Sequence, residues 1–336
     1  YQGVTTVDLF VGHKPDSIPK VDCHSYNWVD LNCSFIIPEN HLAVQYELKY
    51  SQGEIKDKSN FRQLYDCESV TKTNNVFSCR FSENKYRRVA KTFTFQLTAS
   101  NILGTLEQAF EFDNFKNIIP DAPSKFEKVE DSSSHNINSV QTTWKMPMGK
   151  LGALDEKLDF EISVNSECSG EKRILLREFY SGDGPKNFSY RIPLDYSHVW
   201  YVIRIRMKIS RAENDEIMWS PWVSLNQNVQ LAARVPDFPP EVNVGGFNIL
   251  PNNDVYIYWK NVPNCYHNGK SFTYDVSSER GGPTELKESF AIYRKNVPLA
   301  NNGAEIRIKS QNVVGLSRDA SIIRIPSDSE RLWRPK

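Results

Sequence analysis

The sequence has no long hydrophobic run and no excess of charge of either sign. No segment reaches about 18 consecutive apolar residues, so no transmembrane helix is predicted within this chain. Its 41 basic and 41 acidic residues give a formal net charge of zero, which argues against electrostatic binding to nucleic acid or to an anionic membrane. There is no initiator methionine and no signal peptide, so we expect a portion of a longer product.

Motifs for catalysis and for metal binding are also missing. The sequence contains no Gly-x-Ser-x-Gly elbow, no phosphate-binding loop and no His-Glu-x-x-His pair. Its six histidines are scattered along the chain, and no Cys-x-x-Cys or Cys/His spacing suggests zinc. We therefore predict a protein that is not an enzyme and that holds no cofactor and no metal.

Cysteine is scarce and unevenly distributed. The first four of the six cysteines fall in the first third of the chain, and the last two stand alone: Cys23, Cys33, Cys67, Cys79, Cys168 and Cys265. Four cysteines allow three disulfide connectivities, and their spacing alone does not choose among them. N-glycosylation sequons begin at Asn32 and Asn187. Clustered cysteines together with sequons predict an oxidising, extracellular setting.

Two proline-rich joints, at residues 120–123 and 236–240, divide the 336 residues into similar units. Proline stiffens such linkers and cannot continue a β-ladder. After each joint an alternating run ends in a tryptophan, Trp144 or Trp259, and Phe35 takes this place in the first unit. Such a run is expected of the second strand of a β-sandwich. The chain therefore repeats one β-rich unit.

This repeat resembles the fibronectin type III module, which predicts an all-β fold of three tandem fibronectin type III-like β-sandwiches. We expect them at residues 15–118, 119–235 and 236–336. Residues 1–14 are left over, and residues 4–11 look like a strand. That strand would belong either to a preceding domain or to the edge of the first sandwich.

The most distinctive motif is Trp219-Ser220-Pro221-Trp222, which follows a basic strand at residues 204–208. Because side chains alternate along a strand, Arg204, Arg206 and Lys208 should share one face. Tryptophans three residues apart on an extended left-handed segment present both indoles on one side. A planar guanidinium can stack between indoles, so the pattern predicts a structural Trp/Arg stack.

Together, the paired tryptophans and the basic strand resemble the Trp-Ser-x-Trp-Ser signature of class I cytokine receptors. The final Ser of that signature is Val223 here, with Ser224 one place later, so the change affects the Ser–backbone contacts and not the stack. Residues 66–104 and 202–208 are similar to the shared signal transducer of the interleukin-6 family. The divergent Asn- and Lys-rich sequence suggests an invertebrate member. The resemblance implies the disulfides Cys23–Cys33 and Cys67–Cys79.

At the level of function, the resemblance implies the extracellular portion of a single-pass cell-surface receptor, whose first two modules bind a four-helix cytokine. Such receptors associate as homodimers or heteromers and signal through JAK/STAT, using Janus-type kinases on a cytoplasmic tail that this chain lacks. An adhesion protein of fibronectin type III modules is an alternative, but it does not explain the clustered cysteines or the tryptophan pair. A secreted decoy that binds a cytokine without signalling would have the same ectodomain.

Sandwich topology places the candidate ligand site at the joint between the first two units. The EF loop of the first unit, residues 82–90, should meet the BC loop (147–154) and the FG loop (210–217) of the second. Tyr86 and Arg88 lead the candidates because Tyr, Trp and Arg dominate binding hot spots. The predicted ligand-binding residues are Tyr86, Arg87, Arg88, Val89, Lys150, Leu151, Glu213, Asp215, Glu216 and Ile217.

The same topology brings the two isolated cysteines to the second joint. Cys168 follows a strand at residues 158–165 and lies in the far loop of the second unit. Cys265 lies in the BC loop of the third unit, which faces it. A Cys168–Cys265 bridge across the hinge is one prediction; two free thiols and intermolecular pairing are the others.

Overall fold

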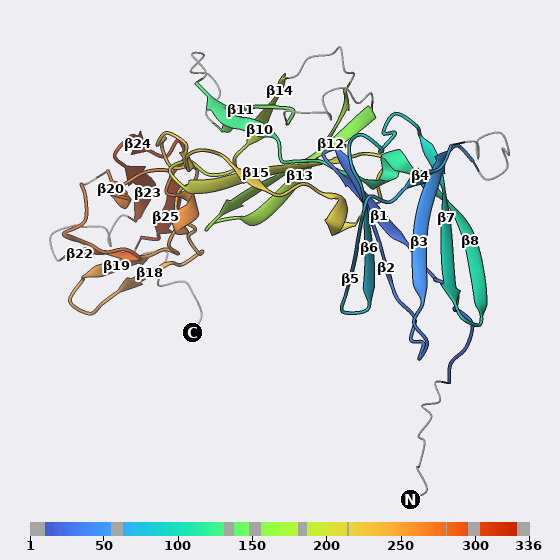
Figure 1. Ribbon diagram of the computed structural model, residues 1–336. Coiled ribbons are helices and arrows are strands. Elements are labelled where there is room, and N and C mark those ends of the chain that lie inside the picture. The colour runs from blue at the N-terminus through green and yellow to red at the C-terminus, as the bar shows by residue number, and fades with distance from the viewer. Residues whose placement is uncertain are drawn as a thin grey trace, which may run out of the picture.

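The computed structural model describes residues 11–54, 63–130, 138–147, 156–180, 187–213, 215–279, 281–294 and 303–327. Over these ranges the chain consists of β-strands joined by loops and short 3-10 turns. Its sheets pack in pairs as three tandem β-sandwiches, which follow one another along a bent rod (Figure 1). No helix in the described ranges has the length and apolarity needed to cross a membrane.

The first sandwich contains two sheets. One has the order β5-β6-β2-β1-β9, with strands Ser69–Thr73, Val76–Phe81, Asp30–Ile36, Asp22–Tyr26 and Ile118–Ile119. The other has the order β4-β3-β7-β8, with strands Tyr65–Asp66, Gln45–Gln52, Thr92–Asn101 and Gly104–Asp113. Period-two alternation sets the layers: on β2, Leu31, Cys33 and Phe35 are buried, whereas Asn32 and Ser34 between them are not.

The second sandwich pairs a small sheet with a large one. The small sheet has the order β10-β11-β14, with strands Ser124–Val129, Ser139–Lys145 and Asn187–Pro193. The large sheet has the order β13-β12-β15-β16, with strands Gly170–Tyr180, Glu156–Ser166, Trp200–Ile209 and Val223–Ser224; β17, Val229–Gln230, also pairs with β15. Trp144 lies buried between the sheets with its ring edge-on to Phe160.

The third sandwich repeats this plan with shorter strands. Its first sheet has the order β18-β19-β22-β21, with strands Phe247–Ile249, Val255–Tyr258, Phe290–Tyr293 and Glu285–Leu286. In its second sheet β20, Thr273–Ser278, pairs with β23, Ala304–Asn312, which also pairs with β24, Gly315–Leu316, and β25, Ser321–Ile325. Trp259 is again a buried member of the core.

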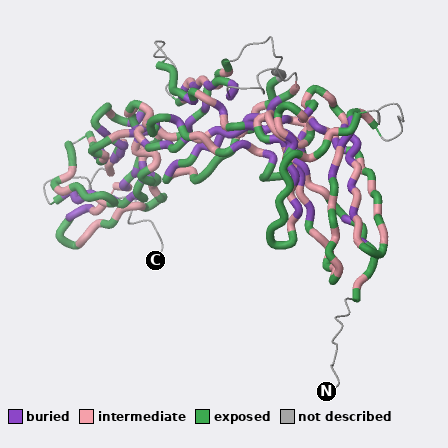
Figure 2. Tube along the Cα trace, in the orientation of Figure 1, coloured by how far each residue is buried: buried purple, intermediate pink, exposed green. Residues whose placement is uncertain are grey.

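The buried side chains form two cores. One apolar cluster runs without a break from Ile18 to Val229, through both the first and the second sandwich. A separate cluster, from Val255 to Ile325, fills the third (Figure 2). The first two sandwiches are therefore packed as one body. The predicted segment limits stay predictions; β9 spans the limit at 118/119, and residues 1–10 lie outside the described ranges.

Candidate functional site

The basic strand β15 alternates between the core and the surface. Ile203, Ile205 and Met207 are buried in the core of the second sandwich. The residues between them, Arg204 and Arg206, therefore lie on the opposite face of the sheet. The Trp219 backbone there has φ −82° and ψ 145°, the extended left-handed conformation that a three-residue repeat requires.

On that face cations and indoles alternate in a five-membered ladder. The Arg204 guanidinium lies 5.0 Å from the Trp222 ring centre. The Arg206 guanidinium lies 4.5 Å from Trp222 and 4.6 Å from Trp219, and is therefore between them. The Lys208 ammonium follows, 5.6 Å from Trp219. The order is thus Arg204, Trp222, Arg206, Trp219, Lys208, and its middle member is only 4% exposed.

Backbone contacts hold the tryptophan segment against β15. The Ser220 N–H donates to the Met207 carbonyl over 2.8 Å, and the Ser220 hydroxyl accepts from the Met207 N–H over 3.0 Å. Val223 pairs with Ile205 where strand β16 lies against β15, at the position where the receptor signature would have its second Ser. One Ser–backbone contact is therefore present, and ordinary strand pairing takes the place of the other.

Carboxylates from neighbouring elements neutralise the ladder. Arg206 donates to Glu161 over 2.6 Å and is also paired with Glu216. Burial alone would raise the pKa of the Asp159 carboxyl, but hydrogen bonds from Arg177 and Ser210, with the nearby Lys208 charge, outweigh burial and hold that pKa below its usual range. The ladder and its carboxylate partners thus form a layer of paired charges on the second sandwich.

The first joint is closed by a strand and a 3-10 turn. The turn η2, Asn114–Asn117, is capped by the Asp113 carboxylate, and β9 follows it directly. β9 pairs in parallel with β1, and Ile118 and Ile119 are buried. β9 also contacts β15 and the turn η4, Glu216–Met218, of the second sandwich. The segment that links the two sandwiches is therefore packed against both of them.

The prediction that Tyr86 is an exposed anchor is wrong. Tyr86 is only 2% exposed, and its hydroxyl donates to the side-chain oxygen of Asn114. Burial raises the pKa of this hydroxyl well above its usual range. The Asn114 amide donates in turn to the carbonyls of Arg88 and Ala90. Tyr86 therefore fixes the EF loop from the inside and offers a ligand nothing.

Other EF-loop candidates do reach the surface. Val89 is 76% exposed. Arg87 is exposed, lies over the Tyr65 ring at 5.1 Å and donates to its hydroxyl. Arg88 is half-buried between Trp28, whose ring centre is 6.0 Å away, and the Glu83 carboxylate. The loop thus presents an apolar tip beside a partly engaged basic cluster.

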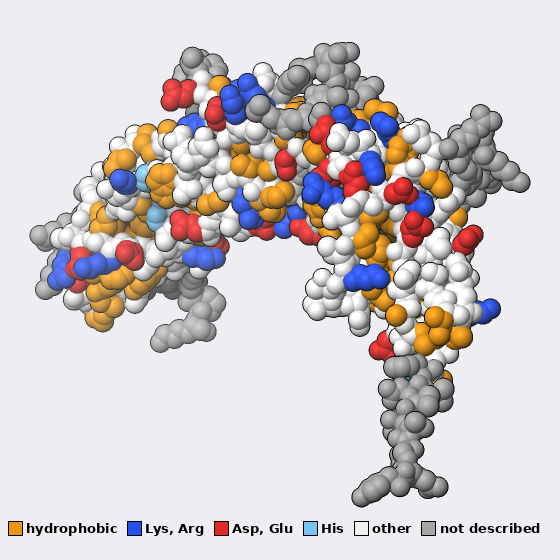
Figure 3. Space-filling view, in the orientation of Figure 1, with side chains coloured by type: hydrophobic (Ala, Val, Ile, Leu, Met, Phe, Trp, Pro, Cys, Tyr) orange, Lys and Arg blue, Asp and Glu red, His pale blue; other side chains and the backbone are white. Residues whose placement is uncertain are grey.

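The acidic FG loop lies beside β1. Glu213, Asp215 and Ile217 line a cleft of about 730 Å³ whose opposite wall includes Lys20 and Asp22. Ile217 is 51% exposed there. We call this space the elbow cleft; its lining also includes His24, Tyr26, Glu111 and Asp113. Figure 3 shows acidic and basic side chains gathered where the two sandwiches meet.

The structure places the acidic FG residues against β1 and β15. Glu213 and Asp215 line the elbow cleft with Lys20, and Glu216 pairs with Arg206. The contribution of β1 was missed because only loops were considered. The sequence signal for this contribution is strand direction. The first strand of a sandwich runs away from the N-terminal end of that sandwich, so β1 must end at the joint. Lys150 and Leu151 lie outside the described residues.

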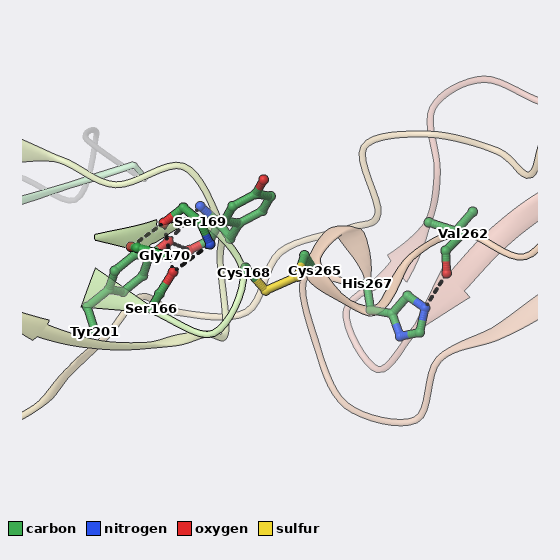
Figure 4. Close-up of a disulfide and its surroundings, with 9 residues drawn as sticks. Ser166, Cys168, Ser169, Gly170, Tyr201, Val262, Cys265 and His267 are labelled. Carbon is green, nitrogen blue, oxygen red and sulfur yellow. Dashed lines mark hydrogen bonds between the residues drawn. A yellow bond between two sulfur atoms is a disulfide. The ribbon is translucent and has the colours of Figure 1, made fainter. Parts of the chain in front are cut away.

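The second joint carries a disulfide. Cys168, in the turn between β12 and β13, is bonded to Cys265 in the turn η5, Asn264–Tyr266, with Cα atoms 5.6 Å apart (Figure 4). The rings of Tyr196 and Phe238 each meet Tyr266 edge-on. The structure also has the bonds Cys23–Cys33 and Cys67–Cys79, and none of the described cysteines is free.

The described residues offer no metal site, since they contain no group of three or more His, Cys, Asp or Glu that could hold an ion. Both glycosylation acceptors lie on strands at the surface. Asn32 is half-buried on β2 and Asn187 is exposed at the start of β14. The arrangement places surface loops of two sandwiches at a fixed joint, with ordinary packing and ion pairs around them.

Comparison with known proteins finds no matching family model. The chain is 23% identical over 338 residues to a protein of Drosophila melanogaster named "Cytokine receptor", covering 96% of this chain and 24% of that protein. It is 23% identical over 332 residues to the leukemia inhibitory factor receptor of Homo sapiens, covering 96% of this chain and 28% of that protein. The receptor of the same name from Canis lupus familiaris gives 23% identity over 335 residues. The chain spans about a quarter of the length of these relatives.

These relatives match along nearly the whole chain, so the similarity includes both the elbow and the third sandwich. The sequence suggested an invertebrate member such as the insect receptor Domeless, and the Drosophila relative is an insect protein. All of the relatives named here are called receptors.

Proposed function

Because this chain resembles class I cytokine receptors over nearly its whole length, we propose that it is the ligand-binding ectodomain of such a receptor and binds a helical cytokine at the elbow of its first two sandwiches. The observation that carries the proposal is the five-membered ladder of Arg204, Trp222, Arg206, Trp219 and Lys208. A sandwich needs no such ladder to fold, whereas the receptor signature is built on it.

The surface at the elbow suits a helix with a mixed apolar and charged face. Val89 on the EF loop, and Ile217 with Tyr26 around the elbow cleft, are exposed apolar side chains at the joint. Glu213 and Asp215 add acidic groups beside Ile217. Such apolar contacts with a charged border are typical of binding hot spots.

Rigidity of the elbow supports the same function. The continuous core and β9 fix the EF and FG loops relative to each other before a ligand arrives. A preorganised surface binds more tightly because less conformational entropy is lost on association. The Trp/Arg stack acts indirectly: it holds β15 and the start of the FG loop in place.

Signalling follows from receptor association. The third sandwich serves as a spacer, and ligand binding brings receptor chains together, so that Janus-type kinases on cytoplasmic tails activate the JAK/STAT pathway. These last steps rest on the family resemblance. The disulfides and the surface sequons favour an extracellular, cell-surface location.

The test is binding of this ectodomain to secreted helical cytokines from its own organism. The site variant combines Arg87→Ala, Val89→Asp, Glu213→Ala and Ile217→Asp, all at exposed positions, so the fold should survive. Ile322→Asp, at an exposed apolar position on β25 far from the elbow, is the matched control. We expect the site variant to lose at least about tenfold in affinity, and the control to bind normally.

The other outcomes separate the alternatives. Binding that the site variant keeps would retain a receptor and move its site away from the elbow. No binding to any cytokine, alone or with a second receptor chain, would overturn the proposal in favour of an adhesion protein. A decoy would bind the ligand but fail to activate a kinase pathway when the full-length product is expressed in cells.

A further inference from the structure

The Cys168–Cys265 disulfide differs from the other two in its exposure and in what it connects. Both of its cysteines are partly exposed, whereas each of the other bonds has at least one buried cysteine, with Cys23 and Cys79 only 2% exposed. Those bonds lie within the first sandwich, while Cys168–Cys265 joins the second sandwich to the third (Figure 4). Neither of its cysteines is a buried member of a core, so cleavage of this bond leaves the buried residues of both cores in place.

This disulfide also lines a cavity at the second joint. The cavity has a volume of about 480 Å³, and its walls come from both sandwiches, with Ser197 and His198 from the second and Gly269 from the third. Cys168 and Cys265 both belong to its lining. Thiol–disulfide exchange depends on access of the attacking thiolate to a sulfur atom. The cavity provides that access from outside the molecule.

The linker between the two sandwiches is anchored on either side of a short free stretch. On the side of the second sandwich, the His198 N–H donates to the Leu231 carbonyl over 3.2 Å. On the side of the third, the Arg234 N–H donates to the Asn268 carbonyl over 3.0 Å. Residues 232–233, both alanine, lie between these anchors. We call residues 232–233 the pivot, because a change in their backbone angles turns one sandwich relative to the other.

The disulfide is a second connection between the two sandwiches, separate from the pivot. Beside it, the Tyr196 ring of the second sandwich meets the Tyr266 ring of the third edge-on, with ring centres 5.4 Å apart. Tyr266 directly follows Cys265 in the turn η5, so the aromatic contact and the covalent bond act at the same place. A single ring contact without the bond restrains a hinge far less than a closed covalent loop does.

We propose that the Cys168–Cys265 bond is a reducible latch, which a dithiol of the thioredoxin class cleaves, so that the third sandwich can turn about the pivot. A thiolate of the dithiol attacks one sulfur and forms a mixed disulfide, while the S–S bond breaks and the other cysteine leaves and takes up a proton. The second thiol of the dithiol then attacks the mixed disulfide and releases the first cysteine. The chain gains two electrons and two protons, and the dithiol becomes a disulfide.

The proposal goes beyond ligand binding and does not rest on the proposed function. The elbow belongs to the core shared by the first two sandwiches, and the third sandwich has a core of its own. Reduction therefore changes the freedom of the third sandwich and leaves the elbow unaltered.

The first measurement is selective reduction. The ectodomain is incubated at neutral pH with increasing dithiothreitol, or with thioredoxin kept reduced by NADPH and its reductase, and is then alkylated and analysed by peptide mass spectrometry. We expect Cys168 and Cys265 to become alkylated at a reductant concentration at least about tenfold below that required by the cysteines of the first sandwich. Simultaneous reduction of all three bonds, or earlier reduction of Cys67–Cys79, would overturn the proposal.

The second measurement is energy transfer between dyes on the second and third sandwiches. Unnatural amino acids carry the dyes at two exposed positions, Glu178 on β13 and Arg324 on β25. We expect selective reduction to widen the distribution of transfer efficiencies while the thermal transitions of both cores stay in place. The variant Cys168→Ser/Cys265→Ser should show the wide distribution without reductant and should not respond to it. Selective reduction that leaves the wild-type distribution unchanged would show that the bond is not a latch.

A glycine variant tests the position of the pivot. Ala232→Gly/Ala233→Gly should match the wild type while the disulfide is intact. After reduction it should give a wider distribution than the reduced wild type, because glycine allows more backbone conformations. Equal distributions in the two reduced proteins would overturn the assignment of the pivot to residues 232–233. The experiment uses no cytokine, so its failure is distinct from a failure of the proposed function.

Discussion

The two joints of this molecule are built on different physical principles. At the first joint, Ile118 and Ile119 are buried in a core that the first two sandwiches share. At the second, separate cores face each other across a disulfide, Cys168–Cys265, and edge-on contacts to the ring of Tyr266. The first joint cannot bend without exposing apolar surface. The second is held by one disulfide bond and by a few aromatic and polar contacts.

Polar groups add to the disulfide and the aromatic contacts at the second joint. The Asn312 amide donates to the carbonyls of Arg234 and His267 over 2.6 and 2.9 Å, and Asn268 donates to Asp237 over 3.0 Å. Such bonds can exchange with water at little net cost, since each contributes only about 1 kcal/mol. The elbow is therefore fixed by a shared core, whereas the direction of the third sandwich depends on one disulfide with aromatic and polar contacts around it.

The largest effect should come from breaking the shared core. Ile118→Ala removes a fully buried side chain between the first two sandwiches. The change should lower the free energy of unfolding by about 2–5 kcal/mol and lower the unfolding temperature of both sandwiches together. Ile306→Ala, buried in the third sandwich, is the matched control and should lower only that unit's transition. Calorimetry measures both. Independent melting of the first two sandwiches would contradict a common core.

Next in size is the loss of the middle member of the ladder. Arg206→Ala leaves Glu161 without its buried partner and two indoles without the cation between them, at about 3 kcal/mol. Arg204→Ala, at a half-exposed position, should cost less than about 1 kcal/mol. Secreted yield should fall in that order, while protein that does fold keeps its cytokine affinity. Normal yield with lost binding would assign the ladder to the ligand site instead.

The ladder was predictable from the sequence because it depends on local periodicity. Alternation along 204–208 and the three-residue spacing of the tryptophans fix which side chains share a face. The position of Cys168 opposite Cys265 required only strand order and loop direction. Domain-scale features that follow from periodicity and topology could therefore be read before any coordinates.

Tyr86 shows why the binding surface could not be read in the same way. The EF loop makes a helical turn, with the Tyr86 N–H donating to the Ser82 carbonyl over 2.8 Å, and this turn directs the ring inward. Its partner Asn114 and the neighbouring Tyr50, which accepts from the Arg87 N–H over 2.9 Å, are distant in sequence. Burial raises the Tyr50 pKa to about 12. Loop composition cannot reveal such contacts.

Removing the Cys168–Cys265 disulfide tests how much this bond contributes to holding the second joint. Cys168→Ser/Cys265→Ser should widen the distribution of distances between spin labels on the second and third sandwiches. The elbow is remote from this bond, so ligand affinity should stay within about 0.5 kcal/mol of wild type. Both cores of the doubly substituted chain should keep their wild-type thermal transitions. An unchanged distance distribution would mean that the polar and aromatic contacts alone fix the joint.

Acid should produce the smallest effect and should separate the ion pairs of the second sandwich from the second joint. The folded-state pKa of Asp159 is held below its unfolded value near 3.9, mainly by Arg177 and Ser210 acting against burial. Its contribution to stability is therefore fully present above that unfolded value and is lost as pH falls through the folded pKa. Denaturant unfolding of the second sandwich should weaken over this window, and Asp159→Asn should flatten the dependence. The second joint, held by a bond that does not titrate, should keep its spin-label distances at the same pH; a widened distribution there would show that its polar contacts also depend on charge.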